Sequence, residues 1–247
     1  MIQTFIEWGG KKYWCNLRLP VDISIPLHSG SANPNAFGIP FPEFSPLKAD
    51  GFIGSVAQGG SVNCENLLIN PHGNGTHTEC AGHISKERIT IHQCLKQFFF
   101  LVKVISVTPV NNCITLASVK EQLIEIPEAI LIRTLPNYVS KLTNNYSGNN
   151  PAYFEPALCT YLALNGVKHL LTDLPSVDPE HDEGKLAAHH EFWQYPHNTR
   201  MDATITEMVY VDDTLEDGLY LLNLQIASIE SDASPSKPVL FKLIHAV

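Results

Sequence analysis

One short segment constrains this chain more than any other. Residues 70–84, NPHGNGTHTECAGHI, place three histidines and one glutamate among three glycines. In an extended segment His77 and Glu79 are two residues apart, so both side chains point to the same face. Imidazole nitrogen and carboxylate oxygen together suit zinc, manganese or iron(II). We therefore predict that the fold presents this segment as a metal site.

The glycines of this segment allow the backbone to turn, so that His72 and His83 can reach the same volume. A single histidine is more often a hydrogen-bonded loop residue, but three beside a carboxylate favour a ligand cluster. A subtilisin-like interpretation of GNGTH fails, because that site also needs a Gly-Thr-Ser nucleophile, which this sequence lacks. Cys80 is a candidate thiol nucleophile, although a small residue packed behind the metal is the favoured interpretation.

Composition narrows the class of protein. The chain has 247 residues, of which 44% are hydrophobic and 17% charged, enough to build a globular core. A formal net charge of -9 without a Lys/Arg run disfavours nucleic-acid and anionic membrane partners. No apolar stretch approaches the roughly 20 residues of a membrane span. The six cysteines form no CxxC pair, and the N-terminus lacks a secretory apolar core, so we expect a cytoplasmic protein.

The hydrophobic pattern predicts a single α/β domain over residues 1–247, with a mixed sheet and flanking helices. The segment from about 29 to 60 is rich in Gly, Pro and Asn and is expected to be an irregular loop. Strands are expected near residues 13–19, 21–27, 97–110, 129–135, 169–178, 218–229 and 237–247, and helices near 154–168 and 182–193.

Three motifs together resemble a known family. GTHTECAGHI, followed by LTDLPSVD and AAHHEFW, is similar to the cyclase family of metal-dependent hydrolases, which includes bacterial kynurenine formamidases and isatin hydrolases. The usual pattern there is His-x-Gly-Thr-His-x-Asp-x-Pro-x-His, then Asp-x-x-Ser-x-Asp, a His-His pair on a helix and a distal glutamate. The resemblance covers most of the chain. It implies a swivelling β/β/α fold with a partly closed sheet, one or two zinc or manganese ions, and homodimers or homotetramers.

The resemblance also implies a set of site residues. Glu79 stands where the family usually has aspartate, and His83 matches a histidine that is a ligand or a proton-transfer group. The distal histidine matches His189, with its neighbour His190 left open. The implied metal ligands are His72, His77, Glu79, His83, His189 and Glu207, and the implied catalytic groups are His83 and His189.

Two departures from the pattern affect this assignment. The family's first histidine falls on Gly73 here, and His72 lies one residue earlier. A bulge at Gly73 is expected to restore its reach, and Asn74 is an alternative ligand. An apparent insertion, WQYPHNTRMD, precedes Glu207. The turn residues Asp173, Ser176 and Asp178 are expected to border the site, without an assigned chemical role.

These residues predict hydrolysis of a C–N bond. A metal ion lowers the pKa of a bound water toward neutrality, so that hydroxide attacks an amide, formamide or lactam carbonyl. His83 or His189 then protonates the leaving nitrogen. Phe37, Phe41 and Phe44 either line a pocket for an aromatic substrate or anchor their loop to the core. The hypotheses are an arylformamidase-like enzyme that releases formate, as in the kynurenine branch of tryptophan catabolism, and a non-catalytic metal-binding member of the same fold.

Overall fold

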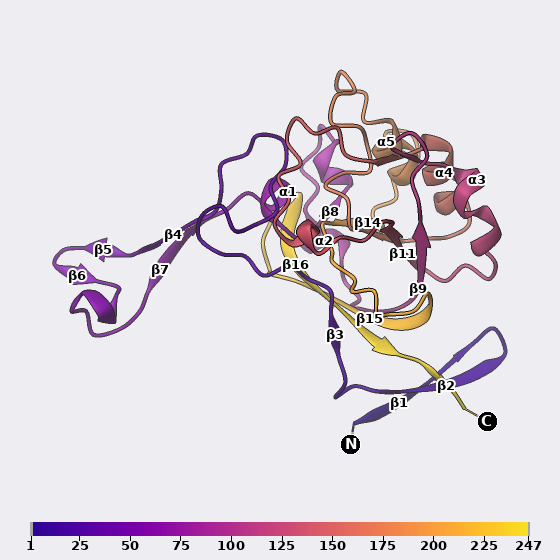
Figure 1. Cartoon of the computed structure of the whole chain (residues 1–247), viewed down its shortest axis with the longest axis horizontal. Helices are drawn as coiled ribbons and strands as arrows, with labels where there is room; N and C mark the ends of the chain where they lie inside the picture. Colours follow the sequence, from indigo (N-terminus) through magenta and orange to yellow (C-terminus); the bar gives the residue numbers. More distant parts are fainter. Residues whose placement is uncertain (1, 247) are drawn as a thin grey trace.

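A mixed sheet that closes on itself forms the centre of the molecule (Figure 1). The computed structural model describes residues 2–246. Seven strands follow one another around the ring, and pairing of the last with the first closes it. A short strand, β3 (Val21–Asp22), extends the sheet beyond β16. In order, the ring contains β15 (Gly218–Ile226), β9 (Phe99–Val107), β11 (Ala129–Thr134), β13 (His169–Thr172), β14 (Thr204–Glu207), β8 (His77–Cys80) and β16 (Ala233–Lys242). The predicted α/β class with a partly closed sheet is confirmed.

Four neighbouring strands of the ring, β9, β11, β13 and β14, run parallel. Parallel strands are covered on both faces, and every residue of β11 and β13 is accordingly buried. Alternate side chains divide between two cores: Ile130 and Ile132 face the helical layer, whereas Leu131 faces the interior of the ring. The crossovers between these strands carry α3 (Leu116–Val119), α4 (Pro156–Leu164) and α5 (Ala187–Trp193).

Helix α5, which carries the His-His pair, is fixed to α4 by large apolar side chains. Phe192 and Trp193 are fully buried in the same core as Leu158 and Leu162 of α4. Burial of such side chains contributes about 1.5–3 kcal/mol each. The helix begins at Ala187 rather than at 182 as predicted, because Asp182 accepts hydrogen bonds from Gly184 N and Leu186 N and forms a turn there. The position of the His-His pair is therefore set by core packing.

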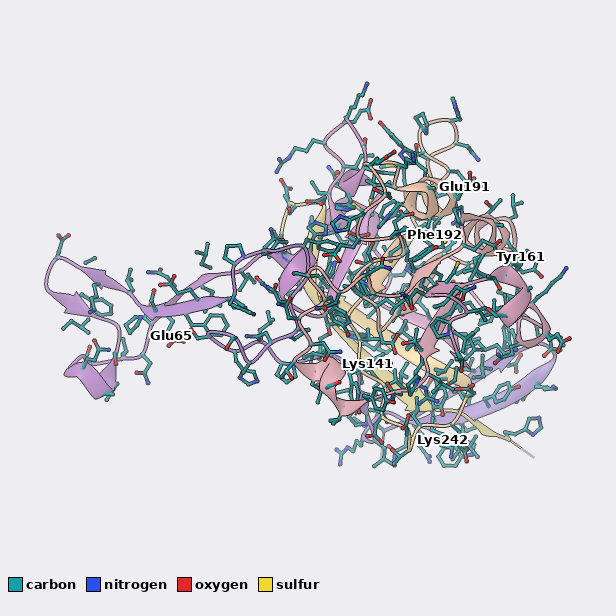
Figure 2. All side chains as sticks on the ribbon, turned by 45° about the horizontal axis from the view of Figure 1, so that its top comes forward. Glu65, Lys141, Tyr161, Glu191, Phe192 and Lys242 are labelled. Carbon is teal, nitrogen blue, oxygen red and sulfur yellow. The ribbon has the colours of Figure 1, made fainter. Side chains whose placement is uncertain are left out.

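An arm projects from the body where the sequence predicts an irregular loop (Figure 1). It is a ribbon in which β4 (Glu43–Pro46) pairs with β7 (Glu65–Leu68), and β5 (Lys48–Ala49) pairs with β6 (Phe52–Ile53) before the turn η1 (Val56–Gln58). Glu65 lies on this arm, well away from Phe192 and Tyr161 in the helical layer (Figure 2). The prediction of a loop over 29–60 is thus wrong from residue 43 onward.

The two ends of the described chain meet in a separate small sheet. Strand β2 (Lys11–Asn16) pairs with β1 (Gln3–Trp8) on one side and β17 (Ile244–His245) on the other. The strand expected over 21–27 is limited to the two residues of β3. No helix within residues 2–246 is both long and apolar enough to cross a membrane. The remaining elements are α1 (Pro71–Asn74), η2 (Ala81–His83), α2 (Ile91–Cys94), β10 (Cys113–Ile114), η3 (Lys120–Gln122), η4 (Val139–Leu142) and β12 (Tyr153–Phe154).

Candidate metal centre

Strand β8 supplies the centre of the site. It lies between β14 and β16 and pairs antiparallel with both. His77 and Glu79 point to the same face of β8, as their spacing predicts, and both are fully buried. The register pairs His77 with Glu207 at the end of β14, and His77 Nε2 lies 3.4 Å from Glu207 Oε2. The structure therefore brings Glu207 to the site in spite of the preceding insertion.

His72 reaches the site from a helical turn, so the predicted bulge at Gly73 is wrong. Pro71 begins α1, and the side chain of Asn70 accepts a hydrogen bond from His72 N. This turn brings His72 Nδ1 to 3.1 Å from Glu79 Oε2. Asn74 does not face the cluster, since it accepts a hydrogen bond from Asn70 N and donates one to Pro40 O.

Position 73, where the family pattern has its first histidine, accommodates no side chain here. A Cβ on Gly73 would lie 2.6 Å from Ile39 Cδ1 and 3.0 Å from Ala36 O. Segment 35–40 is tied to α1 by a hydrogen bond from Ala36 N to Gly73 O. Ile39 and Ala36 therefore occupy the space that a side chain at position 73 would need. The histidine of this chain instead lies one residue earlier, at position 72.

His83 lies at the open edge of the site. It ends the 3₁₀ turn η2, and its Nδ1 is 3.9 Å from Glu79 Oε2. Its ring stacks on His72 with 4.3 Å between centroids. The His83 side chain is 29% exposed, against 0% for His77. Gly82 makes this turn possible, because a Cβ there would overlap Ile89 O.

His189 enters from α5 and closes the buried side of the cluster. Its Nε2 is 3.1 Å from Glu79 Oε1, and its Nδ1 is 2.6 Å from Asp178 Oδ2. Asp178 also accepts hydrogen bonds from Ala188 N and His189 N, so it caps the helix as well as orienting the ring. His190 turns away, with its Nδ1 3.0 Å from Tyr195 O. Of the pair, only His189 contacts the cluster.

Of the other two turn residues, Ser176 supports the site from behind, whereas Asp173 does not border it as expected. Ser176 Oγ accepts a hydrogen bond from Asp178 N, and Val177 N donates to Glu207 Oε1. Asp173 is instead engaged with Lys141 Nζ at 2.7 Å, away from the histidines. Cys80 is fully buried and its thiol faces Ile89 O and Asp232 O, as expected for a small packed residue.

Asp232 belongs to the cluster although the sequence interpretation did not include it. It immediately precedes β16, and its Oδ2 lies 2.8 Å from His72 Nε2 and 3.4 Å from His83 Nδ1. Its position depends on the register of β16 against β8, which joins residues about 150 apart in the chain. An aspartate before a strand carries no local signal of such a contact.

The histidines and carboxylates of the cluster stabilise one another's charged forms. Burial alone disfavours the charged form of His72, but its hydrogen bond to Asp232 and the nearby Glu79 outweigh burial and raise its pKa to about 10. The pKa of His189 is raised to about 10 in the same way, by Asp178 and Glu79 against the effect of burial. The pKa of the Glu79 carboxyl is lowered in spite of burial, because His83, His189 and His72 surround it. In the metal-free protein, protonated histidines thus supply the positive charge that stabilises the Glu79 carboxylate. A bound metal ion would supply the same charge in their place.

Two buried polar atoms without hydrogen bonds indicate that this site fits a metal ion. His77 Nε2 and Glu79 Oε2 are among only four buried side-chain atoms in residues 2–246 that make no hydrogen bond. Both point into the cluster, and such atoms are costly unless a ligand satisfies them. Ligand atoms lie within 4.8 Å of one another in three overlapping groups: His72, His77 and Glu79; His72, His83 and Asp232; Glu79, His83 and His189. The donor set therefore fits one or two divalent cations such as Zn²⁺ or Mn²⁺.

The chain is similar to known proteins in sequence and in fold. The family model for putative cyclases matches residues 21–179. The kynurenine formamidase of Bordetella avium is 30% identical over 186 residues, which cover 74% of this chain and 82% of that protein. A structure described as a potential metal-dependent hydrolase with cyclase activity superposes with a TM-score of 0.68 at 17% identity, covering 90% of this chain and 97% of the other. Isatin hydrolase A from Labrenzia aggregata superposes with a TM-score of 0.67 at 15% identity, covering 90% and 93%.

Proposed function

Because this chain belongs to the cyclase family, we propose that it is a metal-dependent hydrolase that cleaves a C–N bond in a small amide, formamide or lactam. The observation that carries the proposal is the pair of unsatisfied buried atoms, His77 Nε2 and Glu79 Oε2, at the centre of a His/Glu cluster. Relatives named kynurenine formamidase support the arylformamidase-like form of this reaction, and the isatin hydrolases, similar in fold, keep a lactam among the candidates.

The cluster has a buried side, whose residues hold the metal ion, and an open side, which the substrate reaches. A divalent ion, when bound, polarises the substrate carbonyl and lowers the pKa of water toward neutrality. On the buried side, His77, His189 and Glu207 hold their positions through hydrogen bonds to Gly75 O, Asp178 and Val177 N. These three residues therefore serve to bind and orient the metal ion, because the protein encloses them. The substrate approaches from the side on which His72, His83 and Asp232 are partly exposed.

Proton transfer to the leaving nitrogen is assigned to His83. Both nitrogens of His189 are engaged and its side chain is 2% exposed, so it has no path to a substrate. His83 is partly exposed, and its Nδ1 faces Asp232 at 3.4 Å, which leaves Nε2 to deliver a proton. Imidazole is the side chain suited to this role near neutral pH.

Exposed phenylalanines on the segment beside α1 support an aromatic substrate. Phe37 and Phe41 are 43% and 41% exposed on the segment that packs against α1, and aromatic side chains so placed can contact a substrate ring. A cavity of about 260 Å³ adjoins Asp232, and its lining includes Lys86 and Arg88. The same lining carries the carboxyl groups of Glu87 and Asp232, so the cavity offers a substrate both cationic and anionic partners.

A turnover assay tests this function. The purified protein is loaded with Zn²⁺ or Mn²⁺ and offered N-formylkynurenine, isatin and a panel of simple amides, with formate or ring opening as the readout. His77→Ala is expected to lose most of its bound metal and its activity, whereas His190→Ala, outside the cluster, is expected to keep both. Wild-type protein that holds metal stoichiometrically and hydrolyses none of these compounds overturns the proposal in favour of a non-catalytic metal-binding protein.

We also propose that the chain assembles with copies of itself as a homodimer or homotetramer. The arm supports this proposal, because β7 exposes Leu67 and Leu68 at 59% and 68% on a ribbon too thin to bury them itself. Light scattering after size exclusion is expected to give a mass of two or four chains. The double variant Leu67→Lys, Leu68→Lys is expected to shift the mass toward one chain, and a monomeric wild type overturns the proposal.

A further inference from the structure

We propose that Asp232 is the positioning residue of His72, and that it makes His72 bind the metal ion through Nδ1, the opposite nitrogen to that used by His77 and His189. The inference rests on the metal-binding part of the proposed function and concerns how this chain compensates for the displaced histidine. It starts from the hydrogen-bond partner of each histidine ring.

Two of the buried histidines are anchored through Nδ1. The partner of His77 Nδ1 is Gly75 O at 2.9 Å, which can only accept, so Nδ1 carries the proton and Nε2 has the free lone pair. His189 Nδ1 likewise faces the Asp178 carboxylate at 2.6 Å, while Nε2 faces Glu79. Both rings thus present Nε2 to the centre of the cluster, as in carboxylate–histidine–metal arrangements.

His72 shows the reverse arrangement. Its Nε2 faces Asp232 Oδ2 at 2.8 Å, and its Nδ1 faces Glu79 Oε2 at 3.1 Å. The Asp232 carboxylate accepts a hydrogen bond from His72 Nε2, so Nε2 keeps its proton when a metal ion displaces the proton of Nδ1, and the Nδ1 lone pair then points toward Glu79 and His77. Asp232 therefore has the same relation to His72 that Asp178 has to His189, with the two ring nitrogens exchanged.

The use of Nδ1 instead of Nε2 by His72 follows from the path of the backbone at α1. His72 enters the site one residue earlier than the family pattern, and position 73 is closed to a side chain by Ile39 and Ala36. The α1 turn brings the His72 ring beside Glu79. Nδ1 is the ring nitrogen nearer to the backbone, so it makes the contact when the backbone itself comes close. The outer nitrogen, Nε2, then needs a partner on the far side.

Asp232 is held firmly enough to be that partner. Its backbone O accepts a hydrogen bond from Cys80 N, and the next residue, Ala233, pairs with Glu79 in the β16–β8 ladder. The side chain is fixed further because Ser231 Oγ donates to Asp232 Oδ1 at 3.0 Å. The β16 register thus sets the position of Asp232 relative to Glu79.

The first test measures metal affinity without any substrate. Zn²⁺ affinity is determined by competition with a chromophoric chelator for the wild type, Asp232→Ala, Asp232→Asn and the control His190→Ala, whose ring faces Tyr195 O outside the cluster. Loss of an orienting partner costs about 10–100-fold in metal affinity, which we expect for Asp232→Ala, with a smaller loss for Asp232→Asn. His190→Ala is expected to stay within about threefold of the wild type. Circular dichroism and urea unfolding of the metal-free proteins show whether each variant folds.

The second test identifies the ligating nitrogen. In the Zn²⁺-loaded protein, long-range ¹H–¹⁵N correlation spectra of the imidazole rings are expected to place the proton of His72 on Nε2 and those of His77 and His189 on Nδ1. Asp232→Ala is expected to change the His72 pattern and leave the His189 pattern intact.

Three results would overturn the inference: wild-type metal affinity in a folded Asp232→Ala, a proton on His72 Nδ1, or loss of one whole ion in that variant, which would make Asp232 itself a ligand. Absence of hydrolysis by a metal-loaded wild type overturns the proposed function and leaves this inference standing, so the two failures are distinguishable.

Discussion

Replacement of Asp178 by alanine is expected to damage both the fold and the metal site. Three donors converge on its carboxylate: Ala188 N at 2.7 Å, His189 N at 3.1 Å and His189 Nδ1 at 2.6 Å. Helix α5 has no cap of its own, since its N-cap residue is Leu186 at a φ of 45° with no side-chain hydrogen bond. The alanine variant therefore leaves two helix N–H groups and one ring nitrogen without a partner.

The magnitude follows from these bonds. Hydrogen bonds to a charged group contribute about 1.5–3 kcal/mol each, and an unsatisfied buried donor costs about 1–3 kcal/mol. Loss of the two backbone bonds is thus expected to lower the free energy of unfolding of the metal-free protein by about 3–6 kcal/mol, measured by urea denaturation. Loss of the ring contact is expected to weaken Zn²⁺ binding by about 10–100-fold. Asp178→Asn is the matched control, because it retains one acceptor oxygen and is expected to recover part of the stability.

The effect also has a defined pH dependence. Burial raises the pKa of Asp178, but His189 and the two backbone donors outweigh it and hold this pKa below its ordinary value. A lowered pKa gives stability that is complete above the unfolded value, near 4, and is lost as the pH falls through the folded value. The difference between wild type and Asp178→Ala is therefore expected to be largest between about pH 5 and pH 6.5 and to shrink below about pH 4. It is also expected to decline above pH 6.5, because Asp178 raises the pKa of His189 to about 10 and the stability from that pair is lost as the pH rises toward this value. A metal-free Asp178→Ala within 1 kcal/mol of the wild type at pH 7, with unchanged Zn²⁺ affinity, would refute the reasoning.

Three further predictions concern residues outside the ligand set. Burial lowers the pKa of His169 to about 3, so the folded protein is expected to lose about 1.4 kcal/mol of unfolding free energy per pH unit below 6.5. Between pH 7 and pH 5, urea unfolding of His169→Gln is expected to show a smaller loss of unfolding free energy than the wild type. An equal loss in both proteins would contradict this prediction. Lys141→Met leaves the buried Asp173 carboxylate without its cation and is expected to cost about 3–5 kcal/mol of unfolding free energy; a cost below 1 kcal/mol argues against an ionised pair. Gly82→Ala brings a Cβ into Ile89 O and is expected to lower both thermal stability and Zn²⁺ affinity, whereas wild-type values for both would show that the turn can relax.

The local part of the site could be predicted from the sequence. The alternation of His77 and Glu79 places both on one face of a strand, and the structure has that strand as β8. The β-branched run of β11 and the apolar spacing of α4 are equally local signals, and both elements form. The family resemblance added the distant residues His189 and Glu207, which the fold brings to the same cluster.

The remaining parts depend on contacts that no local pattern contains. Whether residue 73 has room for a side chain is decided by Ile39, on a loop that shows no periodicity. Asp232 joins the cluster through strand register alone. The arm was missed because its strands β5 and β6 are two residues long and carry no alternation to detect. For position 73 and for Asp232, the missing information is the position of a distant segment.

The position of β8 between β14 and β16 also sets the order in which the protein can mature. Synthesis proceeds from the N-terminus at about 5–20 residues per second, so His77 and Glu79 emerge well before Glu207 and Asp232, the residues that β14 and β16 bring to them. Pairing across such a separation is slow compared with local structure. A nascent chain halted before residue 204 therefore lacks Glu207 and Asp232, and the full cluster can assemble only when nearly the whole chain has been synthesised.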